Sequence, residues 1–347
     1  MKPSPHRRGS RRPLPVLLIA IMVAACSGPS GDELFVYSAR HYDTDTQLFD
    51  DFTAQTGIRV RLLQGNSDEL LERLNREGVA SPADVLITVD AGRLWRAEQA
   101  GVLQPVESEV LAERVPAHLR HPNGYWFGFS QRLRLIYYNR DAFDPGQVTT
   151  YEDLADPSLD GRICVRSSNN IYNQSLLASM VSHHGAAAAT EWARGLVANL
   201  ARAPQGGDTD QILGVAAGEC ELGVANHYYY VRLLNSEDPD RRAAAERVGI
   251  IFPNQDDRGL HVNVGGAGVV RGAPNREHAV RFLEYLASDE AQALFAEGNH
   301  EYPVVPGIAL DPAIEAWGDF RRDQVNVAEL GRHNPEAVRI ADRVGWR

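Results

Sequence analysis

The sequence predicts an α/β protein in which strands alternate with helices around a mainly parallel sheet. Short apolar runs, such as 84–89, alternate with longer segments of helical periodicity, such as 46–56. Glycines or capping side chains lie at several expected helix ends. Elements of these lengths build a sheet with helices on both faces. The 347 residues are enough for two lobes with substantial cores.

The first part of the mature chain supplies three strand–helix pairs. We expect strands at 34–37, 58–62 and 84–89 and helices at 46–56, 68–77 and 91–100. Asn66 and Glu69 form a capping-box pattern before the second helix, and Asp90 is placed to cap the third. A glycine follows each helix, at Gly57, Gly78 and Gly101.

The rest of the chain repeats this pattern less regularly. We expect strands at 125–129, 132–138, 162–165, 221–225, 248–252 and 261–263, and helices at 173–182, 187–200, 208–217, 276–287 and 289–297. The segment 265–268 lacks the lysine of a phosphate-binding loop, so we interpret its glycines as positions of close backbone packing near a crossover. The tail beyond residue 298 is less periodic.

The N-terminus carries an export signal, in which basic residues precede an apolar run at 14–25 that is too short for a mature membrane span. The residues at 23–26 resemble a bacterial lipobox, with Cys26 as the lipidated first residue of the mature chain. An ordinary signal with a chance cysteine is the alternative, and Arg11-Arg12 leaves a twin-arginine route open. We therefore predict a signal peptide at 1–25, a linker at 26–32, and membrane contact only through a lipid anchor.

Removal of the leader leaves 30 basic and 46 acidic side chains, a net charge of −16. This charge argues against a nucleic-acid partner, but it mainly provides solubility and identifies no ligand. Cys164 and Cys220 are then the remaining cysteines. Because an exported chain meets an oxidising compartment, one interpretation is a disulfide between them, and the other is two separate buried thiols.

Tyrosines gather in three stretches that each follow an expected strand. The stretches are 37–45, 169–174 and 226–230. Aromatic residues suit half-buried sheet surfaces, which would explain the tyrosines of 228–230 alone. Three such stretches at strand-to-helix junctions favour convergence on one cleft instead.

A cluster of phenols with an imidazole favours a hard metal ion of high charge. A free tyrosine has a pKa of about 10, so only a strongly polarising cation offsets the cost of deprotonating several phenols near neutral pH. Fe³⁺ fits this requirement better than Zn²⁺ or Cu⁺, and Ca²⁺ and Mg²⁺ favour carboxylates and carbonyls. Common enzyme motifs are missing from the sequence, which weakens an enzymatic interpretation without excluding it.

Five segments resemble the periplasmic ferric-ion-binding proteins of ABC importers. They are 37–42, 167–174, 226–230, 262–268 and 299–304, and the resemblance covers nearly all of the mature chain. It implies a two-lobed periplasmic-binding-protein fold, in which each lobe is a mixed, mainly parallel sheet flanked by helices and crossing strands form the hinge. The implied N-terminal lobe is 33–131 with about 264–307, and the implied C-terminal lobe is 132–263 with about 308–347.

The resemblance also implies the coordination sphere. The implied Fe³⁺ ligands are His41, Tyr42, Tyr172, Tyr228 and Tyr229. Four phenolates and a neutral histidine leave one excess negative charge, which Arg132 is placed to offset, with Arg134 and Arg40 as alternatives. Some relatives add a synergistic carbonate or phosphate, which five protein ligands would make unnecessary. Tyr37 and Tyr230 are interpreted as packing residues.

The implied function is capture of Fe³⁺ in the cleft between the lobes and its delivery to an ABC permease. We expect a periplasmic, lipid-anchored monomer without enzymatic activity. One alternative is a protein of the same fold that binds a polyamine, thiamine or a sugar. Another is an exported iron-dependent enzyme, which would need an open coordination position and a substrate pocket.

Overall fold

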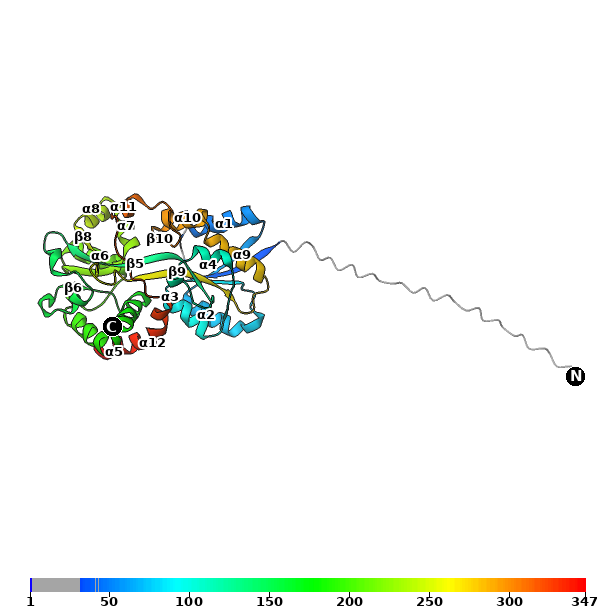
Figure 1. Cartoon of the computed structure of the whole chain (residues 1–347), viewed down its shortest axis with the longest axis horizontal. Coiled ribbons are helices and arrows are strands. Elements are labelled where there is room, and N and C mark those ends of the chain that lie inside the picture. The colour runs from blue at the N-terminus through cyan, green and yellow to red at the C-terminus, as the bar shows by residue number, and fades with distance from the viewer. Residues whose placement is uncertain (2–31, 41, 43) are drawn as a thin grey trace. The chain divides into compact units, whose positions relative to one another are not determined.

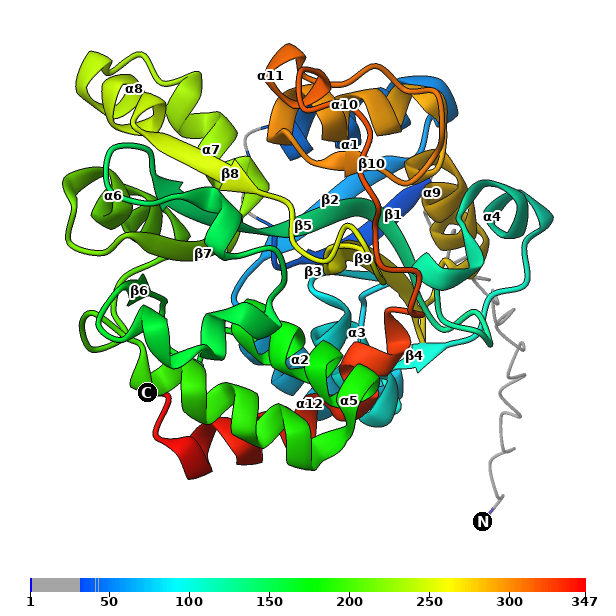
Figure 2. The ribbon, with the colours of Figure 1, turned by 60° about the vertical axis from the view of Figure 1, so that its left-hand side comes forward.

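The computed structural model describes Met1, residues 32–40, Tyr42 and residues 44–347. Its centre is a mixed sheet flanked by helices, with strand order β2-β1-β3-β9-β5-β7-β6 (Figures 1 and 2). The strands are β1 (Glu33–Ser38), β2 (Arg59–Gln64), β3 (Val85–Val89), β4 (Leu103–Gln104), β5 (Phe127–Asn139), β6 (Ile163–Cys164), β7 (Leu222–Asn226), β8 (Val248–Ile251), β9 (Val262–Val270) and β10 (Tyr302–Pro303). The predicted alternation of strands and helices is confirmed.

The helices cover the sheet and come from every part of the described chain. They are α1 (Thr44–Thr56), α2 (Ser67–Glu77), α3 (Ala91–Gln99), α4 (Glu109–Arg114), α5 (Ile171–Ala198), α6 (Asp208–Ala217), α7 (His227–Leu234), α8 (Pro239–Glu246), α9 (Arg276–Leu286), α10 (Asp289–Asn299), α11 (Pro312–Glu315) and α12 (Ala328–Val344). Within the described ranges, none of these helices combines the length and the apolar character needed to span a bilayer.

The long strand β5 belongs to both halves of the sheet. Its first part pairs with β9 and β10, and residues 134–139 pair with β7 and β8. The sequence predicts two strands here, at 125–129 and 132–138. The structure has one, because an irregularity between Gly128 and Ser130 shifts the register without ending the strand.

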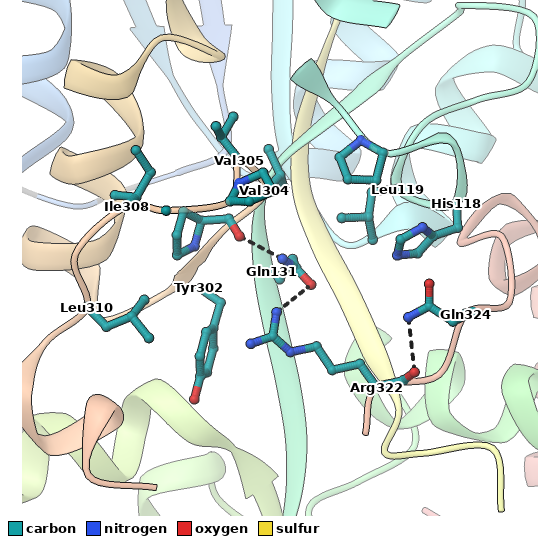
Figure 3. A pocket seen from close by; sticks show the side chains of 14 residues that line it. His118, Leu119, Gln131, Tyr302, Val304, Val305, Ile308, Leu310, Arg322 and Gln324 are labelled. Atoms are coloured by element: carbon teal, nitrogen blue, oxygen red, sulfur yellow. Dashed lines mark hydrogen bonds between the residues drawn. The ribbon is translucent and has the colours of Figure 1, made fainter. Parts of the chain in front are cut away.

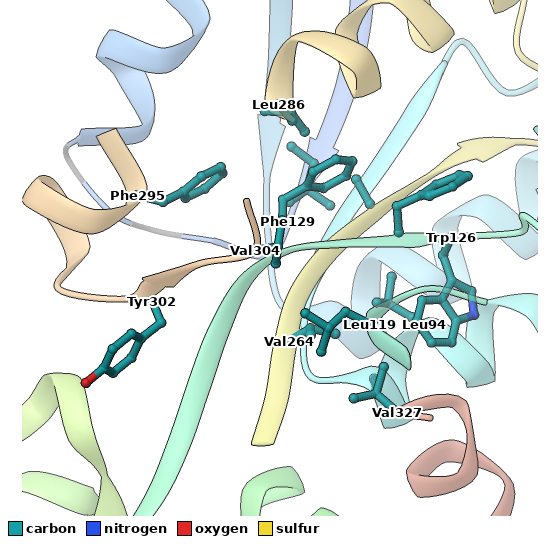
Figure 4. Packing of buried hydrophobic residues seen from close by; sticks show 14 of the residues in the cluster. Leu94, Leu119, Trp126, Phe129, Val264, Leu286, Phe295, Tyr302, Val304 and Val327 are labelled. Carbon is teal, nitrogen blue, oxygen red and sulfur yellow. The ribbon is translucent and has the colours of Figure 1, made fainter. Parts of the chain in front are cut away.

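The glycines of 265–268 lie inside β9, so the predicted end of this strand at residue 263 is wrong. A Cβ on Gly266 would lie 2.4 Å from the carbonyl oxygen of Phe127, and one on Gly268 would lie 2.6 Å from that of Tyr125. These positions therefore allow β9 to approach the neighbouring backbone closely, as predicted. Figure 4 shows Phe129 of β5 and Val264 of β9 in the apolar core around this crossing.

Helices α5 and α12 lie side by side (Figures 1 and 2). The predicted helices at 173–182 and 187–200 form one element with a kink at Gly185, where φ is 79°. No helix was predicted for α12, because Gly331 and Pro335 interrupt its composition. Its buried side chains nevertheless form one face: Ala328, Leu330, Asn334, Ala337, Ile340 and Ala341.

Asp90 connects three segments at the end of β3. Its φ of 82° is unusual for a residue with a side chain. The carboxylate accepts hydrogen bonds from the Gly92 amide at 2.8 Å, the Ser175 hydroxyl at 2.6 Å and the Asn263 side chain at 2.8 Å. Asp90 therefore caps α3 as predicted, and it also links α3 to α5 and β9.

Candidate metal centre

Strand-to-helix junctions carry the predicted tyrosine ligands. Tyr42 lies between β1 and α1, Tyr172 lies in the first turn of α5, and Tyr228 and Tyr229 lie in the first turn of α7. Helix α7 begins at His227, directly after β7 ends, so the last two tyrosines are held by a helix and not by the expected loop. His41 lies outside the described residues.

The tyrosine side chains converge although their sequence positions are far apart. The hydroxyl of Tyr228 donates to that of Tyr172 at 3.4 Å, and the ring centroids of Tyr228 and Tyr229 are 4.4 Å apart. The guanidinium carbon of Arg232 lies 4.9 Å from the ring centroid of Tyr42 and 5.2 Å from that of Tyr228. The four phenols therefore form one cluster.

A cavity of about 290 Å³ adjoins this cluster. Tyr42, Tyr172 and Tyr229 contribute to its wall. Three arginines also line it, namely Arg40, Arg93 and Arg166. The cavity thus combines oxygen donors with positive charge, an environment that suits a small anion beside a metal ion.

Arg132 lies behind the phenols, almost fully buried. Its guanidinium contacts the Glu301 carboxylate at 2.6 Å and the Tyr42 hydroxyl at 3.5 Å. Glu301 also pairs with Arg40 at 3.2 Å, and Arg40 pairs with Asp45 at 3.2 Å. Burial raises the pKa of Glu301, but Arg132 and Arg40 outweigh this effect and hold the pKa at about 2. Two arginines and two carboxylates therefore balance each other.

Two of these phenols are held in the protonated form by their surroundings. Burial raises the pKa of both Tyr228 and Tyr229, and the neighbouring Tyr172 and Tyr42 raise both pKa values further. The Asn226 side chain donates to the Tyr228 hydroxyl at 3.3 Å, a contact that would favour the phenolate once the proton is lost. Without a cation, Tyr228 and Tyr229 stay neutral near pH 7, and a cation of high charge is needed to displace their protons.

Residues 47–322 match the family model of the bacterial extracellular solute-binding proteins. The chain belongs to this family. Iron uptake protein A1 of Synechocystis sp. is 52% identical, over 91% of this chain and 88% of that protein. The Fe(3+)-binding periplasmic protein of Serratia marcescens is 26% identical, over 93% of this chain and 95% of that protein.

Solved structures agree with the sequence comparison. The structure of Trichodesmium IdiA (FutA) with iron and citrate ligands has a TM-score of 0.88 and 52% identity, over 91% of this chain and all of that chain. Apo FutA2 from Synechocystis also gives 0.88, at 51% identity and the same coverage. Within its family, the chain groups with the ferric-iron-binding periplasmic proteins of ABC transporters. The predicted fold class is confirmed, and the family consists of transport proteins and not of enzymes.

Arg232 was not identified from the sequence, although its spacing carried a signal. It follows Tyr228 by four residues, which places both side chains on one face of α7. No carboxylate of the described chain lies within ion-pair distance of Arg232. Arg134, named as an alternative cation, instead pairs with Asp208 at 2.6 Å and donates to Asn173 at 2.6 Å.

The other two singled-out tyrosines point away from the cluster. The Tyr230 hydroxyl donates to the carbonyl oxygen of Val248 at 3.2 Å, and its ring packs 5.4 Å from that of Tyr137. Tyr37 is buried in β1 and donates to the Glu77 carboxylate at 3.1 Å. Both are therefore packing residues in the structure.

Cys164 and Cys220 form a disulfide with their Cα atoms 5.8 Å apart. Cys164 ends β6, and Cys220 lies two residues before β7. Strand β6 leads to α5 and β7 leads directly to α7, which carry three of the clustered tyrosines. The bond therefore joins the two chain segments that position Tyr172 and the Tyr228–Tyr229 pair.

Proposed function

We propose that this protein captures Fe³⁺ through tyrosine phenolates and delivers it to an ABC permease. The proposed ligands are His41, Tyr42, Tyr172, Tyr228 and Tyr229. The observation that carries the proposal is the convergence of four phenols from three distant junctions, with a hydroxyl–hydroxyl distance of 3.4 Å between Tyr228 and Tyr172. The names of the relatives, which include iron uptake and Fe(3+)-binding proteins, support the same metal.

We propose closure of two lobes as the capture step. The lobes would be 33–131 with about 264–307, and 132–263 with about 308–347. Tyr42 then comes from one lobe and the other three tyrosines from the second. Because the complete ligand set exists only in the closed form, Fe³⁺ would stabilise that form through its higher affinity for it.

The charge balance points to a cation other than the one expected from the sequence. Glu301 already neutralises Arg132, so Arg132 orients Tyr42 and contributes little net charge. Arg232 contacts the rings of Tyr42, Tyr228 and Tyr229 and is the better candidate to offset the excess negative charge of four phenolates. We propose His41 as the fifth ligand of the metal. The arginine-lined cavity has room for a carbonate or phosphate beside the metal, and we propose that such an anion takes the fifth coordination position when His41 does not fill it.

The location follows from the family and from the leader. Solute-binding proteins of this family act outside the cytoplasm, and we propose lipidation at Cys26 as the anchor that keeps a monomer near its permease. Replacement of Cys26 by serine should release the protein from membranes into the soluble extract. Membrane association of the Cys26→Ser variant would contradict this assignment.

Absorbance titration with ferric citrate tests the metal site. The wild-type protein should develop a visible phenolate-to-iron charge-transfer band, and Tyr228→Phe should lose most of this band and much of its iron affinity. Tyr230→Phe is the matched control, because Tyr230 is the next residue and points away from the cluster. Equal bands in the wild type and in both variants would place the site elsewhere.

A second titration tests the fifth ligand. His41→Ala should still develop the band when carbonate is supplied and should bind iron more weakly in carbonate-free buffer, because the anion then fills the vacant coordination position. The wild type should show little dependence on carbonate. The same carbonate dependence in both proteins would remove His41 from the ligand set.

A further inference from the structure

A second cavity, of about 320 Å³, lies across β5 from the tyrosine cluster. Successive side chains of a strand point to opposite faces. Arg132 faces the tyrosines, whereas Gln131 lines the second cavity. The segment that contains β10 also contributes to both sites, because Glu301 contacts Arg132 and Tyr302 lines the cavity (Figure 3). The two sites therefore share two chain segments and no lining residue.

The cavity contains a half-buried cation, Arg322, that lacks a carboxylate partner among the described residues. Within the described chain, Arg322 forms no ion pair, whereas the buried Arg132 and Arg134 each do. The Arg322 guanidinium donates to the Gln131 side chain at 3.4 Å and lies 4.4 Å from the ring centroid of Tyr302 (Figure 3). A long hydrogen bond and an aromatic ring compensate less of the desolvation of a guanidinium than a carboxylate does.

The rest of the wall is neutral. No aspartate or glutamate is among the described residues that line the cavity, although the mature chain carries 46 acidic side chains. Val304, Val305, Ile308 and Leu310 form an apolar wall on one side (Figure 3), and His118 and Gln324 add polar groups opposite. Burial lowers the pKa of His118, so this side chain is neutral at pH 7 and can donate or accept a hydrogen bond.

We propose that this cavity is a second ligand site for a small organic carboxylate with a short apolar chain. The carboxylate would pair with Arg322, and the chain would lie against Val305 and Ile308. Both halves of such a ligand find a complementary surface, because charge-assisted hydrogen bonds hold one end and apolar burial holds the other. The site does not depend on the proposed iron site.

Calorimetric titration with hexanoate tests this proposal, and hexan-1-ol serves as the uncharged probe. Hexanoate should bind saturably at millimolar concentrations, and hexan-1-ol should bind at least about tenfold more weakly, because a charge-assisted contact is lost. Arg322→Gln should weaken hexanoate binding by a similar factor. Arg321→Gln is the matched control, because it removes the same charge from the exposed neighbouring residue.

A cavity-filling variant tests the site without changing Arg322, whose replacement could itself disturb the fold. Ile308 is half-buried, so Ile308→Trp should be tolerated and should block the site while Arg322 stays in place. Absence of saturable hexanoate binding to the wild type would overturn the proposal, as would unchanged binding in both Arg322→Gln and Ile308→Trp. Ferric titration of the same samples is a separate measurement, so failure here leaves the iron site untouched.

Discussion

Glu301 is the carboxylate that compensates the charges of two buried arginines, Arg132 and Arg40, behind the tyrosines. It contacts both Arg132 and Arg40, and its side chain is fully buried. Removal of one partner from such a group leaves an uncompensated charge in a region of low dielectric. The geometry of Tyr42 depends on this residue in turn, because the Tyr42 hydroxyl accepts from the Arg132 guanidinium.

Glu301→Gln should therefore lower the free energy of unfolding at pH 7 by about 3–5 kcal/mol. The pKa of Glu301 is about 2 in the folded protein, below its usual 4.5, so the carboxylate stabilises the fold above pH 4.5. This stabilisation is lost as the pH falls from about 4.5 towards 2, and the difference between variant and wild type should narrow in that window. Urea unfolding at several pH values measures both effects.

The exposed Glu297 of α10 supplies the control for this substitution. Glu297→Gln removes the same charge and should change the unfolding free energy by less than about 0.5 kcal/mol. A similarly small effect of Glu301→Gln at pH 7 would show that the arginines find other partners.

At the scale of elements, the sequence was informative where periodicity and capping agree. Asn66 caps α2 and Asp90 caps α3 as predicted, because a side-chain acceptor at a helix start acts locally. Helix α12 was missed, since its stability comes from packing against α5 and not from its own composition. The predicted strand at 261–263 was shorter than β9, because the need for glycines in β9 comes from the neighbouring backbone, which the sequence does not show.

The residues of the candidate site also fall into those that local sequence patterns identified and those that they did not. The tyrosine stretches could be found because each lies next to a strand end in the sequence. Glu301 and Arg232 were not assigned a role, because one acts through contacts with residues 169 and 261 positions away and the other through its face of a helix that was not predicted. The contacts of Glu301 leave no local pattern in the sequence, whereas the four-residue spacing between Tyr228 and Arg232 becomes a signal once a helix is expected there.

Gly266→Ala should destabilise the protein through the contact between β9 and β5. The added Cβ would lie 2.4 Å from the Phe127 carbonyl oxygen, which neither strand can relieve without shifting. We expect the free energy of unfolding, measured with urea, to fall by about 1–3 kcal/mol. Gly146→Ala is the control, because its Cβ meets its nearest atom at an ordinary 3.4 Å. Equal stability of the two variants would mean that β9 has room to move.

The disulfide should contribute stability that is lost on reduction. It joins cysteines 56 positions apart, and closing a loop of this length restricts the unfolded chain by about 4 kcal/mol in the loop-entropy model. Cys164→Ser with Cys220→Ser should therefore lower the unfolding free energy by about 2–5 kcal/mol. The double variant should keep the charge-transfer band at low temperature, because neither cysteine contacts iron in the proposal. Unchanged stability in the double variant would contradict the loop argument.

For the whole molecule, the buried histidines His227 and His261 are expected to make the fold sensitive to mild acid. Burial lowers the pKa values of His227 and His261 to about 3 in the folded protein. The usual value is 6.5, so the unfolded chain binds protons below pH 6.5 that the folded chain does not. Stability should therefore fall as the pH drops from about 6.5 towards 3.

Urea unfolding between pH 7 and pH 5 should show this loss. Each histidine contributes a slope of up to about 1.4 kcal/mol per pH unit below its usual pKa. His261→Gln should remove the share of the slope that this histidine contributes. A pH dependence that is the same in the wild type and in His261→Gln would assign the acid sensitivity to other groups.

Asp90 has one more consequence for the molecule as a whole. Its carboxylate holds Gly92, Ser175 and Asn263, which come from α3, α5 and β9. When one rigid body turns against another, points near the axis barely move, and displacement grows with distance from it. The hydrogen bonds of Asp90 to these three segments can persist during a rotation of one lobe against the other only if the rotation axis passes close to Asp90. In the proposed closure of the lobes, Asp90 would therefore lie close to the axis, and the largest displacements would occur at the parts of the lobes farthest from it.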